Sequence, residues 1–230
     1  HFFRGIEDGP PLKWFGPVHI IILTFFLIGV YLLVVKKFGI KEKKHRHIFF
    51  NTIIGLLFVD QIILWTWQIK SGHFSWDMSL PLYHCRIAVW MLILGVAFNI
   101  RKMKLIGIYW GTLGSVMALI LTDLYKFRFP HYTNIQFFLV HILMGWLIIG
   151  LLSLPNIVIN KKDNRFVLLF TNIYNIGLFL FNQLMNFNFP KVNYGYMKEL
   201  PPMLPPFTNI ILHLVFMIVI FNIGIAFLGF

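Results

Sequence analysis

Seven long apolar runs limit what this chain can fold into, because each is about as long as a helix that crosses a bilayer. About 20 apolar residues are enough for one crossing. Of the 230 residues, 58% are hydrophobic and 12% are charged, whereas soluble domains carry about 25% charged residues. We therefore predict an all-α fold: a polytopic integral membrane helix bundle with about seven transmembrane helices, in a single transmembrane domain over residues 1–230. The predicted spans cover residues 19–35, 47–69, 80–100, 105–121, 134–154, 166–185 and 207–227.

The lysines and arginines divide unevenly between the two sides of the predicted bundle. Of the 20 Lys and Arg residues, twelve follow the first, third and fifth spans and seven lie in the segments on the opposite side. Cytoplasmic loops carry the excess of positive charge. We therefore expect the N-terminus outside, the C-terminus in the cytoplasm, and a multi-pass protein of the plasma membrane. The same rule explains the net charge of +12 without a nucleic-acid partner. The abundance of Ile, Phe, Asn and Lys suggests a bacterial source.

The cysteine count limits the chemistry of any site. The chain has one cysteine, which excludes an internal disulfide and a metal cluster held by several thiolates. His19, His141 and His213 with a carboxylate are a conceivable metal site, but their spacing matches no recognised ligand signature. We therefore predict neither a metal nor a cofactor.

The one cysteine lies in the stretch Ser79-Leu-Pro-Leu-Tyr-His-Cys-Arg-Ile-Ala-Val-Trp90, which opens the third span. Ser79 is a typical capping residue and Pro81 fits a first helical turn, so we expect the helix to begin there. In a first turn, the unpaired backbone N–H groups and the helix dipole favour a thiolate. Cys85 is therefore the candidate nucleophile.

Polar residues of the predicted spans gather in the half of the bundle assigned to the outside. Such residues are costly in lipid and by default mark a functional site. Every span contributes at least one, which predicts one polar pocket that opens outward. The candidates besides Cys85 are His19, Asp60, Gln61, His84, Arg86, Asp123, His131, Gln136, His141, Asn182 and His213.

A thiol nucleophile needs a base within hydrogen-bond reach. His84 is adjacent to Cys85 in sequence but lies about 100° around the helix, so a histidine of another span suits this role better. His141 lies at the right depth and is the first choice, followed by His213 and His19. Supporting roles are open to an orienting carboxylate, a phosphate-binding arginine and an oxyanion donor. Asp60 or Asp123 is the candidate carboxylate, and Arg86 is the candidate arginine. The candidate oxyanion donors are Gln136, Asn182 and His131.

Structural interpretations compete with these functional ones. A lone cysteine in a membrane helix is usually a small packing residue, and a lone histidine is usually held by hydrogen bonds. Asp60 and Arg86 would also form a simple ion pair. Gly107, Gly111 and Gly114 share one helix face with Ala118, which is typical of close helix packing in membranes.

The chain resembles the YwaF-like bacterial integral membrane proteins, which are related to animal transmembrane protein 164. The resemblance begins at Leu80-Pro-Leu-Tyr-His-Cys-Arg86 and extends over nearly the whole chain. Its other stretches are Phe15-Gly-Pro-Val-His19, Tyr109-Trp-Gly-Thr-Leu-Gly114, Phe129-Pro-His131, Ile135-Gln-Phe-Phe-Leu-Val-His141 and Asn193-Tyr-Gly-Tyr-Met-Lys198.

This resemblance implies a membrane acyltransferase that moves a fatty acyl chain from a phospholipid to a lysophospholipid. It maps the acyl-carrying cysteine to Cys85 and the histidine to His141, in agreement with the choice made from depth. The expected partners are therefore a membrane phospholipid or lysophospholipid. A small-molecule transporter, or a substrate-binding membrane subunit, is the alternative, because an outward polar pocket suits it as well.

Overall fold

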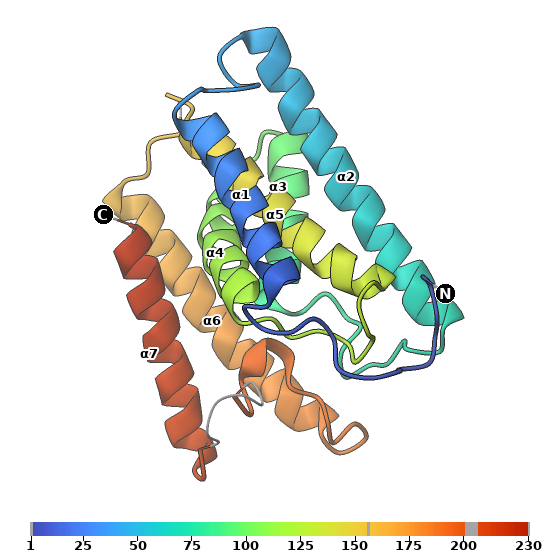
Figure 1. The fold of residues 1–230 in the computed structure, drawn as a ribbon. Helices are drawn as coiled ribbons and strands as arrows, with labels where there is room; N and C mark the ends of the chain where they lie inside the picture. The colour runs from blue at the N-terminus through green and yellow to red at the C-terminus, as the bar shows by residue number, and fades with distance from the viewer. Residues whose placement is uncertain (1, 156, 201–206, 230) are drawn as a thin grey trace. The chain divides into compact units, whose positions relative to one another are not determined.

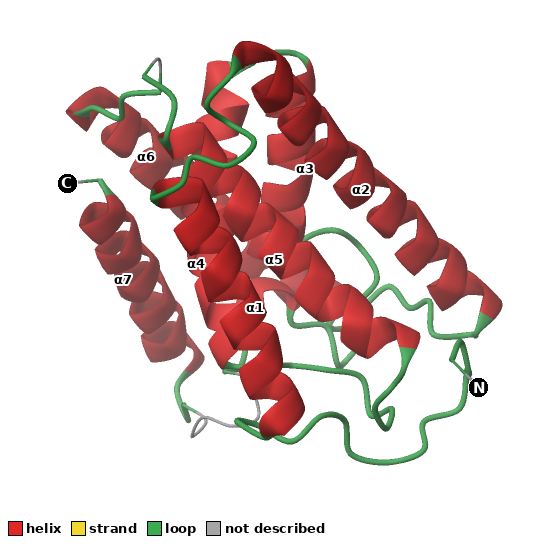
Figure 2. Ribbon diagram, turned by 45° about the horizontal axis from the view of Figure 1, so that its top comes forward, coloured by secondary structure: helices red, strands yellow, loops and turns green. Residues whose placement is uncertain are grey.

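The structure is a computed structural model that describes residues 2–155, 157–200 and 207–229. These residues form α-helices and one short 3₁₀ helix, with no strand among them (Figures 1 and 2), which confirms the predicted all-α fold. The elements are α1 (Pro17–Val34), α2 (Lys43–Lys70), α3 (His84–Ala97), α4 (Arg101–Ile120), α5 (Tyr132–Leu152), α6 (Lys161–Met185), η1 (Tyr194–Tyr196) and α7 (Ile210–Leu228).

Six of these helices are long and apolar enough to cross a membrane, which confirms the predicted polytopic bundle. They are α1, α2, α4, α5, α6 and α7. The helix of the predicted third span, α3, has only 14 residues. At 1.5 Å per residue its length is about 21 Å, which is less than the roughly 30 Å of a bilayer's hydrocarbon core.

The start of α3 differs from the prediction. The first hydrogen bond of the helix runs from the Ile87 N–H to the Tyr83 carbonyl at 2.9 Å, so the helix begins four residues later than the predicted span. The expectation that Ser79 caps it is wrong, because the Ser79 hydroxyl accepts the Ser75 N–H at 3.0 Å. The Leu80 N–H in turn donates to the Tyr194 hydroxyl at 3.0 Å. These bonds hold the chain before α3 in a turn.

The start of α6 is set by a capping box at Asn160. Its side-chain oxygen accepts the backbone N–H groups of Lys162 and Asp163 at 2.9 and 3.1 Å. The Asp163 carboxylate accepts the Asn160 N–H at 3.1 Å. This reciprocal pair satisfies N–H groups that a helix start leaves without partners. The helix therefore begins at Lys161, five residues before the predicted span.

The chain forms two compact units. The first comprises His1–His73 and Ala88–Val158, and the second comprises Phe74–Ile87 and Ile159–Phe230. The division falls within α3, after Ile87. Cys85 therefore belongs to the second unit, and His141 belongs to the first.

Helix α5 is the core of the first unit, where it packs against α1, α2 and α4 (Figure 1). Small residues permit the close approach predicted for α4, and they do so toward two helices. A Cβ atom at Gly107 would lie 2.6 Å from Leu92 of α3, and one at Gly111 would lie 2.7 Å from Ile148 of α5. Glycine at these two positions therefore lets α4 pack tightly between α3 and α5.

The second unit has its own core, in which α6 packs against α7 and η1. Leu178, Val192, Tyr194, Met197 and Met217 form its buried apolar cluster. Leu80, Leu82 and Tyr83, which precede α3, pack against this cluster. The segment that leads to Cys85 is therefore anchored in the core of the second unit.

Candidate functional site

Cys85 is the second residue of α3 and its side chain is half-buried. The N–H groups of Cys85 and Arg86 precede the first helical hydrogen bond, so they have no partner within the helix. The sulfur therefore lies at the positive end of the α3 dipole. The Arg86 guanidinium donates to the Ser79 carbonyl at 3.0 Å, which keeps this cation beside the same turn.

His84 is held by the two helices of its own unit. Its Nε2 donates to Oδ1 of Asn175 on α6 at 2.7 Å. Its ring stacks on Phe221 of α7, with 4.2 Å between the ring centroids. Tyr174, one residue before Asn175, donates its hydroxyl to the Leu82 carbonyl at 2.6 Å. The residues on both sides of the α3 start are thus fixed to α6.

Residues 193–198, which we call the Tyr194 turn, connect the parts of the second unit around this helix start. The Tyr194 hydroxyl donates to the Trp76 carbonyl at 2.8 Å and accepts the Leu80 N–H. The Asn182 carboxamide accepts the Tyr194 N–H at 3.0 Å and donates to its carbonyl at 2.9 Å. Gly195 has φ +64°, and a Cβ atom there would lie 2.9 Å from the His84 ring. The turn therefore packs directly against the residue that precedes Cys85.

His213 of α7 binds the same turn through one ring nitrogen. Its Nε2 donates to the Tyr196 carbonyl at 2.7 Å. Its Nδ1 is buried and has no hydrogen-bond partner among the described residues. In the neutral ring Nδ1 is then the acceptor nitrogen, which gives the second unit a basic imidazole nitrogen.

His141, in the first unit, has the tautomer that a general base requires. Its Nδ1 donates to the Phe137 carbonyl, one helical turn earlier, at 2.6 Å. The neutral ring then has its lone pair on Nε2. The Ser115 hydroxyl of α4 donates to the His141 carbonyl at 3.0 Å, which fixes this part of α5 against α4.

Asp60, Gln61 and Gln136 form one buried hydrogen-bonded cluster between α2 and α5. One carboxylate oxygen of Asp60 accepts N–H groups from Gln61 at 2.9 Å and from Gln136 at 2.8 Å. A buried carboxylate without hydrogen bonds costs much free energy, and donors such as amide N–H groups reduce that cost. The amide groups of both glutamines are therefore engaged in holding Asp60.

His19 has both ring nitrogens engaged by the main chain. Its Nδ1 accepts the Phe15 N–H at 3.0 Å, and its Nε2 donates to the Leu119 carbonyl at 2.8 Å. Both sites of the imidazole are thus used in joining the start of α1 to the end of α4. Asp123 is exposed in the loop that follows α4.

His131 caps α5 and also binds the N-terminal segment. Its Nδ1 accepts the Thr133 N–H at 3.2 Å, and its Nε2 donates to the Arg4 carbonyl at 3.0 Å. Further bonds join residues 2–9 to residues 126–132, and we call this contact the N-terminal clasp. Within it, the Tyr132 N–H donates to the Phe2 carbonyl at 3.1 Å. The Arg128 N–H donates to the Asp8 carboxylate at 2.8 Å.

Acidification is expected to open the N-terminal clasp. Burial lowers the pKa of His131 below its ordinary value of 6.5, opposed by the Arg4 carbonyl, and the Arg128 N–H lowers the pKa of Asp8. Both groups bind protons more readily when the clasp is open than when it is closed. The clasp is therefore most stable above pH 6.5 and is weakened as the pH falls through the lowered pKa of His131. Amide hydrogen exchange at Tyr132 and Asp8, corrected for the intrinsic rate, should accelerate between pH 7 and pH 5.

A His131→Gln variant provides the control for this titration. Glutamine cannot take up a proton in this range, so its exchange should change little between pH 7 and pH 5. An equal pH response in wild type and variant would exclude His131 as the titrating group.

The predicted candidates thus fall into several local groups. Cys85, His84 and Arg86 share the first turn of α3, and Asn182 and His213 bind the Tyr194 turn in the same unit. Sequence reasoning missed Asn175 and the Tyr194 turn as structural partners of this site. Asn175 was detectable as an amide in the middle of an apolar span, and the turn was visible in the sequence as Tyr194-Gly195-Tyr196.

Two features of the described residues bear on possible ligands. They contain no group of three or more His, Cys, Asp or Glu side chains placed to hold a metal ion. A pocket of about 530 Å³ is lined by residues of α2 and the N-terminal segment, and none of the predicted site residues is among them.

Comparison with known proteins gives one match. The model of the family described as the TMEM164 family matches residues 14–228 of this chain. No curated protein and no solved structure matches the chain.

Proposed function

This chain belongs to the TMEM164 family, and from this premise we propose that it is a membrane acyltransferase that moves fatty acyl chains between phospholipids through a thioester at Cys85. The observation that carries the proposal is the position of Cys85. The one thiol of the chain is half-buried in the first turn of a helix, where burial opposes the thiolate and the helix dipole and the Arg86 cation favour it, so that a base is needed to remove the proton. The same cysteine is the one to which the family resemblance assigns the acyl group.

The proposed reaction has two steps, and the second regenerates the free thiol of Cys85. The Cys85 thiolate attacks the ester carbonyl of a donor phospholipid, a C–S bond forms, and the C–O bond of the ester breaks. The lysophospholipid alkoxide leaves and takes the proton that the base removed from the thiol. In the second step the hydroxyl of an acceptor lysophospholipid loses its proton to the base and attacks the thioester, so that a C–O bond forms and the C–S bond breaks. The leaving thiolate takes the proton back from the base, which restores both groups.

The N–H groups at the start of α3 suit the oxyanion of each tetrahedral intermediate better than the side chains considered from sequence. Asn182 uses its amide on Tyr194, His131 is engaged by Thr133 and Arg4, and Gln136 holds Asp60. The Cys85 and Arg86 N–H groups lie before the first helical hydrogen bond. Donors fixed in this way stabilise developing charge without reorganisation.

We propose His141 as the general base. Replacing His141 distinguishes this catalytic role from a purely structural one. His141→Gln should lower the acyl-transfer rate by about 10² to 10⁴-fold and move the acidic limb of the pH–rate profile to higher pH, because the rate then follows the ionisation of the thiol alone. His213→Gln is the matched comparison, because a glutamine N–H can still donate to the Tyr196 carbonyl. If His213→Gln moves the acidic limb to higher pH and His141→Gln leaves it in place, the base is His213.

Trapping the intermediate tests the function itself. Purified protein is mixed with a phospholipid that carries a labelled acyl chain, without an acceptor, and quenched with acid. We expect one acyl group per chain, mapped by mass spectrometry to the peptide with Cys85 and released by neutral hydroxylamine, as a thioester requires. Label that survives hydroxylamine, or protein that never acquires label from any phospholipid class, would overturn the proposal.

A further inference from the structure

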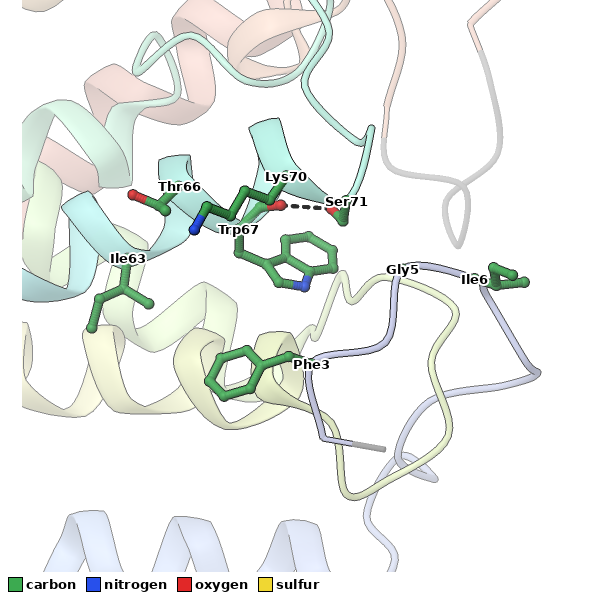
Figure 3. A pocket seen from close by; sticks show the side chains of 8 residues that line it. All are labelled: Phe3, Gly5, Ile6, Ile63, Thr66, Trp67, Lys70 and Ser71. Atoms are coloured by element: carbon green, nitrogen blue, oxygen red, sulfur yellow. Dashed lines mark hydrogen bonds between the residues drawn. The ribbon is translucent and has the colours of Figure 1, made fainter.

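We infer that the pocket at the end of α2 is a binding site for a phospholipid, with the phosphate held by Lys70 and Trp67. Eight residues line the pocket, which has a volume of about 530 Å³. Four of them, Ile63, Thr66, Trp67 and Lys70, form one face of α2 at i, i+3, i+4 and i+7. The opposite wall is the N-terminal segment, with Phe3, Gly5 and Ile6. Figure 3 shows these walls around the indole of Trp67.

The first observation is an unused hydrogen-bond donor on Trp67, a residue that lines the pocket. Trp67 is only 6% exposed, and its Nε1 has no hydrogen-bond partner among the described residues. Its ring is fixed from the other direction, because it stacks on His73 with 5.0 Å between the centroids. In Figure 3 the nitrogen lies on the edge of the indole turned toward Phe3. A buried N–H of this kind favours a ligand with an acceptor oxygen, because leaving the donor unsatisfied costs free energy.

The second observation is the polarity of the remaining lining residues. The Thr66 and Ser71 hydroxyls donate to the helix carbonyls of Ile62 and Trp67, each at 2.7 Å. The side-chain donors left to a ligand are therefore the Lys70 ammonium and the Trp67 N–H. None of the eight described residues that line the pocket is acidic. This arrangement favours an anion, and a phosphate oxygen suits both donors.

The third observation is the combination of depth and apolar surface. Helix α2 has 28 residues, so its length is about 42 Å, which exceeds the hydrocarbon core and puts its last residue, Lys70, at the level of lipid head groups. Phe3, Ile6 and Ile63 are large apolar side chains that remain exposed. A phospholipid would cover Ile63 and Phe3 with an acyl chain while its phosphate binds Lys70.

The site does not rest on the proposed acyl transfer, so its test uses full-length Cys85→Ala protein, which cannot form the thioester. The probe is phosphatidylglycerol with a photoreactive diazirine on one acyl chain, added to protein in maltoside micelles. After irradiation we expect adducts on the peptides that contain residues 3–6 and 63–71. Unlabelled phosphatidylglycerol should compete, whereas diacylglycerol, a free fatty acid and inorganic phosphate should not.

Variants then assign the contacts. Lys70→Gln should lower the labelling at least about fivefold, because it removes a charge-assisted bond, and Trp67→Phe should lower it while keeping the aromatic packing. Ile63→Trp should block the pocket and leave both donors in place. Lys126→Gln removes an exposed lysine of the same unit that does not line the pocket, and it should label as wild type.

Several results would overturn the site. One is the formation of adducts outside the two peptides, and another is undiminished labelling of both Lys70→Gln and Ile63→Trp. A third is a loss of labelling with Lys126→Gln equal to that with Lys70→Gln, which would mean general attraction between lysines and lipid. Equal competition by diacylglycerol would show that the acyl chain alone is bound, and stronger competition by the fatty acid would replace the phosphate with a carboxylate. Helix content and melting temperature, measured for each variant, separate loss of binding from loss of fold.

Discussion

Cys85→Ser protein is expected to transfer acyl chains at less than about one thousandth of the wild-type rate, because a serine hydroxyl is a far weaker nucleophile unless a strong base activates it. The thiol lies at the start of α3 and belongs to a half-buried residue, so the exchange of sulfur for oxygen changes the volume of the site little. The measurement is the initial rate of transfer from a labelled phospholipid to a lysophospholipid. The melting temperature should stay near that of wild type.

The single thiol allows an independent check by chemical modification. Because the chain has one cysteine, a maleimide can react at one sulfur only, and the loss of activity should follow the modified fraction in a one-to-one relation. Donor phospholipid should slow the modification. Cys85→Ser protein that retains more than about a tenth of the activity would exclude nucleophilic catalysis by this residue.

Gly195→Ala is expected to destabilise the second unit by about 2–4 kcal/mol and to lower its melting temperature by several degrees. Gly195 has φ +64°, a conformation that residues with a Cβ adopt only at a cost. The added Cβ would also lie 2.7 Å from Leu178 and 2.9 Å from the His84 ring. The turn would have to move, and with it the bonds from Tyr194 to Trp76 and Leu80 that hold the chain before α3.

The matched control is Gly177→Ala, in the same unit. Gly177 lies in α6, and a Cβ atom there would have no neighbour within 4 Å. Alanine has the higher helix propensity, by about 1 kcal/mol, so this variant should be as stable as wild type or slightly more stable. Thermal unfolding in one detergent measures both variants. Equal melting temperatures for the two would contradict the close packing of the Tyr194 turn against His84.

Much of the fold follows from the sequence, because apolar length is a strong constraint in a membrane. The predicted spans correspond to α1 through α7 in order, but α3 is too short to count among the six candidate membrane spans, and the ends of the other helices differ from the prediction. The ends depend on local hydrogen bonds that periodicity does not contain. The Asn160 capping box extends α6 backward, and the bond from Leu80 to the Tyr194 hydroxyl delays α3.

Less of the candidate site follows from the sequence. Depth along a helix can be estimated from residue numbers, so polar residues could be assigned to one end of their spans. The hydrogen-bond partner of each side chain cannot be read in this way. His19 is a lower-ranked candidate base after His141 and His213, and its sequence position does not show that its two ring nitrogens serve the Phe15 N–H and the Leu119 carbonyl. The pairing of Cys85 with His141 stays a prediction that the variants above test.

The unequal burial of the helices has a consequence for how this chain can change in evolution. In α5, 67% of an 18-residue apolar stretch of the helix is buried inside the protein. The corresponding share is 11% in α1 and 17% in α7. Lipid accepts almost any apolar side chain, so α1 and α7 can exchange Leu, Ile, Val and Phe freely over time. Substitutions in α5 must instead preserve shape. Distant homologues should therefore be recognised by their short polar motifs and by α5, whereas α1 and α7 should retain little sequence similarity.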